Sequence, residues 1–164
     1  MAKKKSKVMQ WLPLVAILLG VVSVVMLFLP AVVRKDTDLE FSGWQTAFGY
    51  TDADSYVKVN FLNFSFILFI GVLAVIAGVV CSLLQVAMPK GNLFALIATA
   101  CFVVFAVCCF LQVVFLAPGS LYTLDGYISA EKAKEGFELG IGSIIGGITG
   151  LCSAGVCAVS ALKK

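Results

Sequence analysis

Four long stretches of this 164-residue chain contain no charged residue, and this pattern limits the possible folds more than any other feature. The stretches cover residues 8–33, 59–89, 91–124 and 139–162, and they are 26, 31, 34 and 24 residues long. A helix that crosses the hydrocarbon core of a bilayer needs about 20 mostly apolar residues. Each stretch is therefore long enough for one spanning helix, and none comfortably holds two.

The composition agrees with a membrane protein. The chain is 61% hydrophobic and 13% charged, whereas soluble domains carry about 45–50% apolar and about 25% charged residues. Backbone polar groups in hydrocarbon must pair within the structure, so only helices or a closed barrel can span it. Barrel strands alternate apolar and polar residues, and runs such as residues 102–107 do not. The sequence therefore predicts an all-α integral membrane protein.

The predicted architecture is an antiparallel bundle of four transmembrane helices that forms a single membrane domain over residues 1–164. The expected spans are residues 11–33, 61–88, 93–116 and 139–162, with outer loops at 34–60 and 117–138 and an inner turn at 89–92. The first apolar run exceeds twenty residues and lacks an Ala-x-Ala site, which favours an uncleaved span over a secretory signal peptide.

The distribution of basic residues predicts the orientation. The side that holds both termini carries seven Lys or Arg residues and the other side carries five. Four of the seven precede the first span, which usually dominates the orientation. We expect both termini to be cytoplasmic in a multi-pass protein of the plasma (cytoplasmic) membrane. The short loops favour a bacterial inner membrane.

Small residues recur every fourth position along the fourth span. They are Gly142, Gly146, Gly150, Ala154 and Ala158. Helices in lipid associate by close packing, and small residues let two backbones approach. The stripe is therefore a candidate seam between protomers of a homo-oligomer or a packing face inside one bundle. We favour the intramolecular alternative, because a four-helix monomer must bury such a face.

The first outer loop contains a helix-start signal, because Ser42 is followed three residues later by Gln45. We expect a short helix that lies on the outer leaflet and places aromatic rings at headgroup depth. The candidate interfacial aromatics are Phe41, Trp44, Phe48 and Tyr50. The alternatives are an irregular loop packed on the bundle, or a hairpin that pairs residues 39–41 with residues 56–59.

In the second outer loop, turn signals stand at Pro118-Gly119 and Asp125-Gly126. Ser129 is a candidate cap for a helix that bends at Gly136 and runs into the fourth span. Across the membrane, the inner turn joins two antiparallel neighbours.

The residues expected inside the membrane offer little chemistry. The chain has no histidine, and its six cysteines all lie in predicted spans without a Cys-x2-Cys pair. We expect these thiols to be buried small hydrophobes rather than ligands. Intramembrane ionisable residues usually mark proton relays and ion paths, and the predicted spans contain none. The sequence therefore predicts a protein that is not an enzyme and that holds no metal or cofactor.

The layout resembles the claudin-type tetraspan arrangement in topology: four spans, inner termini and a larger first outer loop with a tryptophan. That family carries a Trp…Gly-Leu-Trp pattern and a cysteine pair in this loop. This chain has Gly43-Trp44-Gln45 and no loop cysteine.

Two functions remain from different classes. The first is a structural or accessory membrane protein that acts through helix packing and outer-loop contacts. Its expected partners are the lipid bilayer and either a second copy or another membrane protein, without nucleic acid. The alternative is a small channel or uncoupled transporter for a small solute, with a polar lining drawn from Asn63, Thr99, Gln112 and Thr149.

Overall fold

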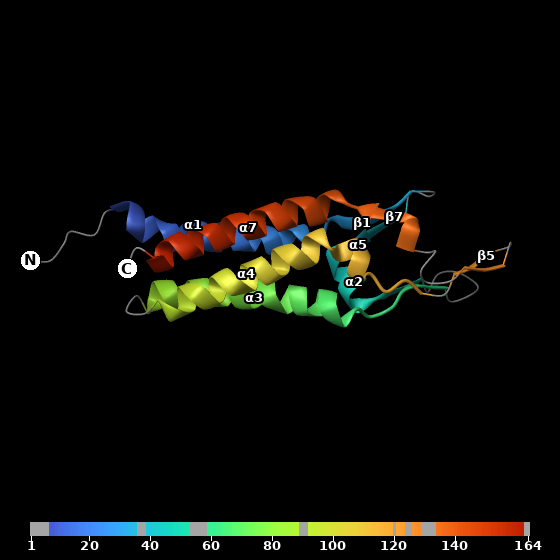
Figure 1. Ribbon diagram of the computed structural model, residues 1–164, viewed down its shortest axis with the longest axis horizontal. Coiled ribbons are helices and arrows are strands. Elements are labelled where there is room, and N and C mark those ends of the chain that lie inside the picture. Colours follow the sequence, from blue (N-terminus) through green and yellow to red (C-terminus); the bar gives the residue numbers. More distant parts are fainter. Residues whose placement is uncertain are drawn as a thin grey trace, which may run out of the picture.

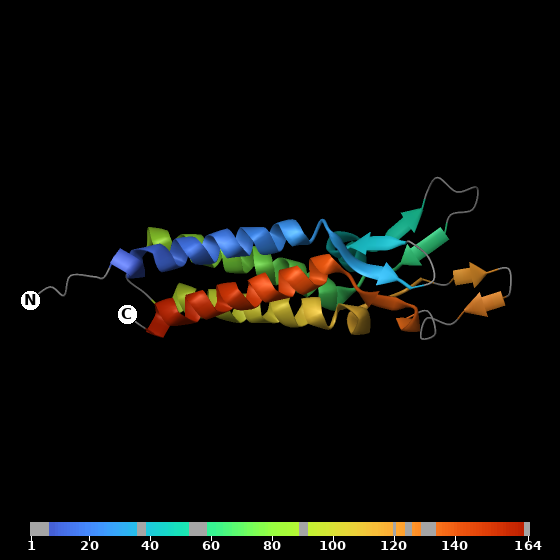
Figure 2. The same ribbon diagram turned by 90° about the horizontal axis from the view of Figure 1, so that it is seen from above.

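Four helices packed side by side form the body of the protein (Figure 1). The computed structural model describes residues 7–35, 39–52, 59–88, 92–119, 121–123, 126–128 and 134–162. The four helices are α1 (Lys7–Met26), α3 (Phe66–Ala87), α4 (Leu93–Phe110) and α7 (Ile141–Leu162). The start of α1 and the end of α7 lie at the same end of the bundle, and the chain runs up and down between its two ends (Figures 1 and 2).

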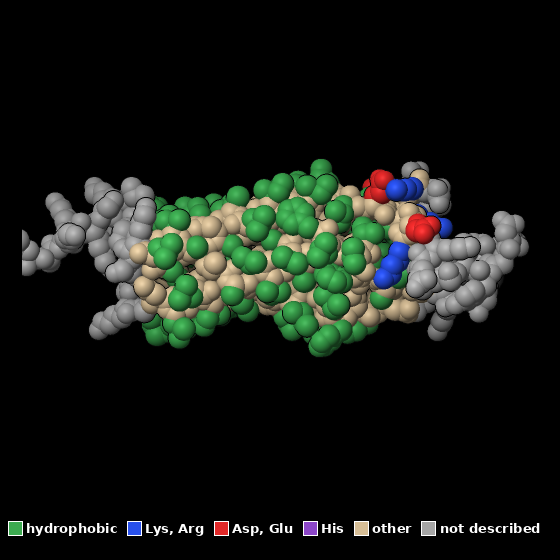
Figure 3. Space-filling model, viewed as in Figure 1, with side chains coloured by type: hydrophobic (Ala, Val, Ile, Leu, Met, Phe, Trp, Pro, Cys, Tyr) green, Lys and Arg blue, Asp and Glu red, His purple; other side chains and the backbone are tan. Residues whose placement is uncertain are grey.

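Three of these helices are long and apolar enough to cross a membrane. They are α3, α4 and α7, with 22, 18 and 22 residues, and the apolar part of α1 is shorter (Trp11–Met26). At about 1.5 Å per residue, 22 residues extend about 33 Å, close to the thickness of a bilayer's hydrocarbon core. Large apolar side chains such as Leu18 and Leu96 are exposed on the bundle, and Figure 3 shows hydrophobic side chains spread along the whole length of this face. The protein is therefore a candidate multi-pass membrane protein.

The helices form a ring in which α4 packs on α3 and α7, and α1 packs on α7 and α3. The side chains of Phe102 and Phe105 from α4 fill the space inside the ring and are 0% and 2% exposed. The Phe102 ring fits between two glycines. A Cβ on Gly20 would lie 2.9 Å from Phe102 Cζ, and one on Gly78 would lie 3.0 Å from Phe102 Cε1. The large ring is thus accommodated because its two neighbours have no side chain.

The prediction of an all-α protein is confirmed only in part: the structure is mostly helical, but the described residues also form seven short strands at the end of the bundle opposite the termini, which we call the outer end (Figure 2). The strands are β1 (Pro30–Arg34), β2 (Glu40–Ser42), β3 (Tyr50–Asp52), β4 (Val59–Leu62), β5 (Leu121–Thr123), β6 (Gly126–Ile128) and β7 (Phe137–Leu139). They make a three-stranded sheet of order β2-β1-β7 and two hairpins, β3-β4 and β5-β6. All of these pairs are antiparallel.

The first predicted span, residues 11–33, ends too late. Helix α1 stops at Met26, and three successive i→i+3 bonds then tighten the chain as far as Leu29. Pro30 has no N–H for a further helical bond, and it begins β1, in which Val32 pairs with both Phe41 and Leu139. Val32 is fully buried in a second core under the sheet. The apolar run therefore continues past the helix because it also supplies this second core.

The other expected boundaries change for the same reason. Residues 59–62 form β4, so α3 begins at Phe66 rather than at residue 61. The third helix is interrupted at Leu111 and resumes as α5 (Gln112–Phe115). Gly136 lies in a turn that leads into β7, so no helix runs through it into α7. That prediction is wrong because Phe137 is buried beside Phe41 under the sheet; the expected cap at Ser129 lies outside the described residues.

Replacement of Gly20 by alanine tests the fit of Phe102. The added methyl group would lie 2.8 Å from Val79 Cγ2 as well as 2.9 Å from Phe102 Cζ, so Gly20→Ala should destabilise the protein by about 1–3 kcal/mol. Thermal unfolding in detergent measures the loss. Gly155→Ala is the matched control, because nothing lies within 4 Å of its Cβ position. An equal or higher midpoint for Gly20→Ala than for Gly155→Ala would contradict this packing.

Candidate functional site

A short helix follows β2 at the outer end of the bundle. This helix, α2 (Gly43–Phe48), has the capping box that the sequence predicts: the Gln45 N–H donates to Ser42 Oγ at 3.3 Å, and the Ser42 N–H donates to Gln45 Oε1 at 2.9 Å. The helix stops at Gly49, whose positive φ of 87° suits a residue without a side chain. The prediction of a helix here is therefore confirmed.

The alternative hairpin is wrong. Its first half belongs to β2, which pairs with β1. The partner of β4 is β3. Residues 56–58 lie outside the described residues.

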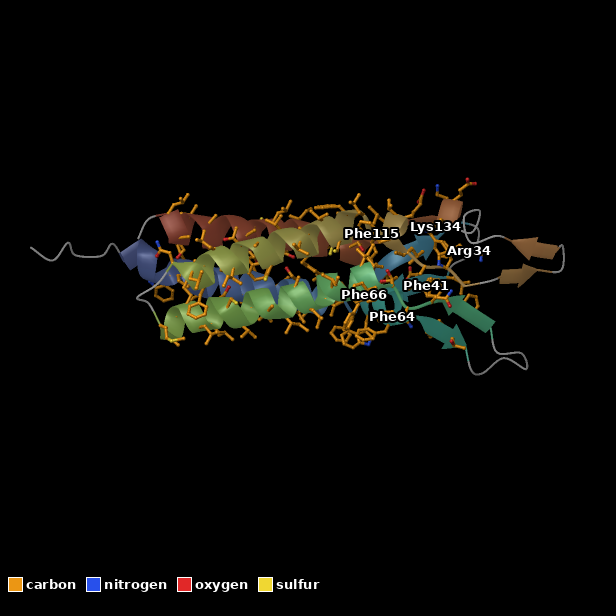
Figure 4. All side chains as sticks on the ribbon, turned by 60° about the horizontal axis from the view of Figure 1, so that its bottom comes forward. Arg34, Phe41, Phe64, Phe66, Phe115 and Lys134 are labelled. Carbon is orange, nitrogen blue, oxygen red and sulfur yellow. The ribbon has the colours of Figure 1, made fainter. Side chains whose placement is uncertain are left out.

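Five aromatic rings form a continuous surface beside α2, which we call the aromatic shelf. They are Phe28, Trp44, Phe48, Phe64 and Phe69. The Trp44 and Phe48 rings stack with centroids 4.3 Å apart, and Phe48 meets Phe69 edge-on at 5.4 Å. Trp44 and Phe48 remain 42% and 40% exposed. The shelf adjoins the outward-facing apolar side chains at the start of α3, where Figure 4 labels Phe64 and Phe66.

The other two candidate aromatics lie elsewhere. Phe41 is only 3% exposed and packs against Tyr50, Phe61 and Phe137 with centroid distances of 5.9, 6.0 and 6.1 Å. It belongs to the core under the sheet, so it does not reach a membrane surface as expected. Tyr50 is partly exposed and packs on Phe41 and Phe61. Alternation within short strands, rather than the α2 helix, decides which way these two rings point.

The small-residue stripe packs inside a single chain. A Cβ on Gly142 would lie 2.9 Å from the Leu29 carbonyl oxygen, and one on Gly150 would lie 3.0 Å from Phe105 Cδ1. Gly146 faces Met26 and Cys109 at ordinary contact distances. Farther along α7, Ala154 is buried and Ala158 is half-buried. The stripe thus allows α7 to approach both α1 and α4, which is the intramolecular arrangement.

A polar junction joins the bundle to the outer cap, which is the part of the protein formed by the strands and α2. Gln112, at the start of α5, donates from Nε2 to Thr46 Oγ1 on α2, and its Oε1 accepts from Ser143 Oγ on α7. The Thr46 hydroxyl also reaches the Gly43 carbonyl at 2.8 Å, and the Ser143 hydroxyl reaches the Ala31 carbonyl in β1 at 2.8 Å. All three side chains are buried. The sequence indicates polar residues at depth here, but it does not show that three distant segments meet.

The four residues proposed as a channel lining do not come together. Asn63 precedes α3 and bonds to the Pro118 carbonyl, whereas Thr99 bonds to the Ala95 carbonyl in its own helix. Thr149 bonds to Ser23 across the α1–α7 contact. Gln112 belongs to the polar junction. The structure therefore places these polar groups in separate structural roles.

The cysteines are less uniformly buried than expected. Cys108, Cys109 and Cys157 are buried, whereas Cys152 is exposed on α7. Within the described part of the chain, no group of three or more His, Cys, Asp or Glu residues has a geometry that could hold a metal ion.

The described charged side chains gather beyond the outer ends of the helices (Figure 3). Lys35 and Glu138 form an ion pair at 3.0 Å, and both side chains are at least half exposed. Lys134 Nζ donates to the Val114 carbonyl at 3.2 Å. Figure 4 places Lys134 and Arg34 farther toward the strands than Phe64 and Phe66. Aromatic rings and charges thus follow each other along the long axis, as at the boundary between a membrane and water.

Together, the apolar bundle and this graded outer end define a candidate small polytopic membrane protein. No protein-family model matches the chain, and no curated protein and no solved structure matches it.

The depth of Trp44 is measurable because the chain has two tryptophans, Trp11 and Trp44. In liposomes, Trp11→Phe leaves Trp44 as the single tryptophan. Lipids brominated near the headgroup should quench its fluorescence more than lipids brominated near the chain ends. The variant Trp44→Phe is the control that assigns the signal. Quenching of Trp44 by an aqueous quencher alone would contradict an interfacial shelf.

Proposed function

We propose that this chain is a structural or accessory protein of the plasma membrane, and that a bacterial inner membrane is its setting. In this proposal four helices cross the bilayer with both termini in the cytoplasm, and the strands and α2 form an outer cap. The cap contacts a membrane-protein partner or lipid headgroups. The protein is not an enzyme and acts by binding.

The observation that carries the proposal is the contrast between the helix bundle, whose interior is filled by apolar side chains, and the cap, which has exposed charges. Phe102 and Phe105 fill the bundle, so the helices act as an anchor. At the outer end, the second core and the polar junction hold the cap to that anchor. Lys35, Glu40 and Glu138 present exposed charges there. A cap on a packed anchor is suited to recognition outside the membrane.

The packing of Phe102 and Phe105 also argues against the alternative of a channel. A conducting path needs a continuous polar or hydrated lining, and two buried rings stand inside this bundle. The hydroxyls of Ser23 and Thr149 lie 2.8 Å apart, and each also lies within hydrogen-bond distance of a backbone carbonyl in its own helix. Such bonds satisfy buried polar groups and hold helices together.

Photo-crosslinking in living cells tests the proposed role of the cap. A photoreactive amino acid replaces Glu40 or Glu138 at the cap, and replaces Leu18 or Leu96 on the outward face of the bundle as the matched control. The proposal predicts a discrete protein or lipid adduct at the cap positions. Its absence there, with adducts formed at the bundle positions alone, would contradict a recognition role for the cap.

Ion and solute flux from liposomes separates the proposal from the channel alternative. Liposomes that contain the purified protein should leak no faster than protein-free liposomes. Protein-dependent flux that Phe102→Trp lowers would show a path through the bundle and would overturn the proposal.

A further inference from the structure

The hydrogen bonds of the polar junction do not use all of its hydrogens. Gln112 Nε2 carries two hydrogens, and one of them goes to Thr46 Oγ1. No acceptor among the described residues takes the second. Rotating the Gln112 amide by 180° makes Nε2 the donor to Ser143 Oγ instead, and one Nε2 hydrogen again remains. The spare hydrogen therefore does not depend on how the amide is oriented.

The junction also has more hydrogen-bond acceptors than hydroxyl hydrogens. The Ser143 hydroxyl has a single hydrogen, but both Gln112 Oε1 and the Ala31 carbonyl lie within its reach. The Thr46 hydroxyl faces a similar choice when the Gln112 amide is rotated, because the Gly43 carbonyl is its other acceptor. The Ala31 carbonyl also accepts from the Gly140 N–H at 2.8 Å, so the Ser143 choice leaves one of its two lone pairs free. A small molecule that both accepts and donates would satisfy the junction.

Two adjoining cavities lie beside the Gln112 side chain. Their volumes are about 20 and 10 Å³, which is near the minimum that holds one water molecule. They share the lining residues Leu27, Gly43, Phe105, Cys109 and Gln112. The smaller cavity is also lined by Ala31 and Ser143. Gln112 thus lines both cavities and Ser143 lines the smaller one, so two polar groups of the junction reach a space of suitable size.

We infer that the polar junction binds one ordered water molecule in these paired cavities. The water accepts the spare Gln112 hydrogen and donates to the Ala31 carbonyl oxygen, which the Ser143 hydrogen leaves free when it goes to Gln112 Oε1. It has the two to four polar partners that buried waters require. This site links β1 and α5 at the point where the cap meets the bundle. It does not depend on which partner the cap recognises.

A change in cavity volume gives opposite results for a hydrated and an empty site. Cys109→Val adds a methyl-sized group to the wall that both cavities share. If the site holds water, the substitution expels it and leaves Gln112 unsatisfied, so the unfolding midpoint should fall by about 2–4 °C. The same substitution in a Gln112→Met background, where no amide is left unsatisfied, should leave the midpoint unchanged or raise it. Equal shifts in the two backgrounds would overturn the inference.

Nuclear magnetic resonance in lipid nanodiscs observes the water directly. With glutamine side chains labelled with ¹⁵N, the Gln112 amide should show a cross-peak to water that persists when a paramagnetic reagent bleaches exposed amides. Gln112→Met identifies the Gln112 resonance by its loss. An observed Gln112 resonance without a water cross-peak would overturn the inference, whatever the stability of the variants.

Discussion

The need to pair every backbone N–H and C=O group in hydrocarbon governs this protein from one end to the other. In hydrocarbon, only a helix satisfies these groups within a single segment, and the four apolar segments of this chain form helices in spite of many β-branched residues. Beyond the hydrocarbon, water and neighbouring segments supply other partners. The chain then turns to strands as soon as α1 ends, and Val32 pairs on both sides within a three-stranded sheet.

Close packing of the helices follows from residue size rather than from hydrophobicity, because lipid is as apolar as the helices themselves. Phe102 can stand inside the ring since Gly20 and Gly78 leave room for it. Gly142 and Gly150 do the same for α7 against its two neighbours. In the same bundle, the buried Ser23 hydroxyl bonds to the hydroxyl of the half-buried Thr149. The bundle therefore gains close contacts from its glycines and an interhelical hydrogen bond from Ser23 and Thr149.

The junction of bundle and cap is the second place where polar groups must be satisfied. Gln112 connects α2 to α7 through Thr46 and Ser143. The chain before α3 also meets the chain after α5, because the Asn63 N–H donates to the Ala117 carbonyl at 2.7 Å. Segments that are far apart in sequence are thus fixed to one another just outside the helices. This arrangement holds the aromatic shelf and the charged surface at defined heights above the bundle.

The sequence predicts those parts of the fold that depend on local pattern. Charge-free stretches locate the four helices, and Ser42 with Gln45 predicts the start of α2. Hydropathy does not distinguish a membrane helix from a buried strand that follows it, which is why the predicted first span extends over residues 30–33. Pro30 is the local signal for that break.

Other features of the outer end depend on contacts between distant segments. Phe41 becomes a core residue because β1 and β7 bring Val32 and Phe137 beside it. The polar junction likewise requires residues 46, 112 and 143 to meet. The spacing of residues within one stretch of sequence does not indicate contacts between distant segments, so these contacts could not be predicted from the sequence alone.

The central claim is that the four helices cross the membrane and that both termini lie on the cytoplasmic side. Reporter fusions that are active on only one side of the membrane measure this most directly. The account predicts a cytoplasmic signal for a reporter fused after Lys164 and an outer signal for reporters inserted at Asp54 and at Gly126. An outer signal after Lys164, or a cytoplasmic signal at either loop, would contradict the number of crossings or their orientation.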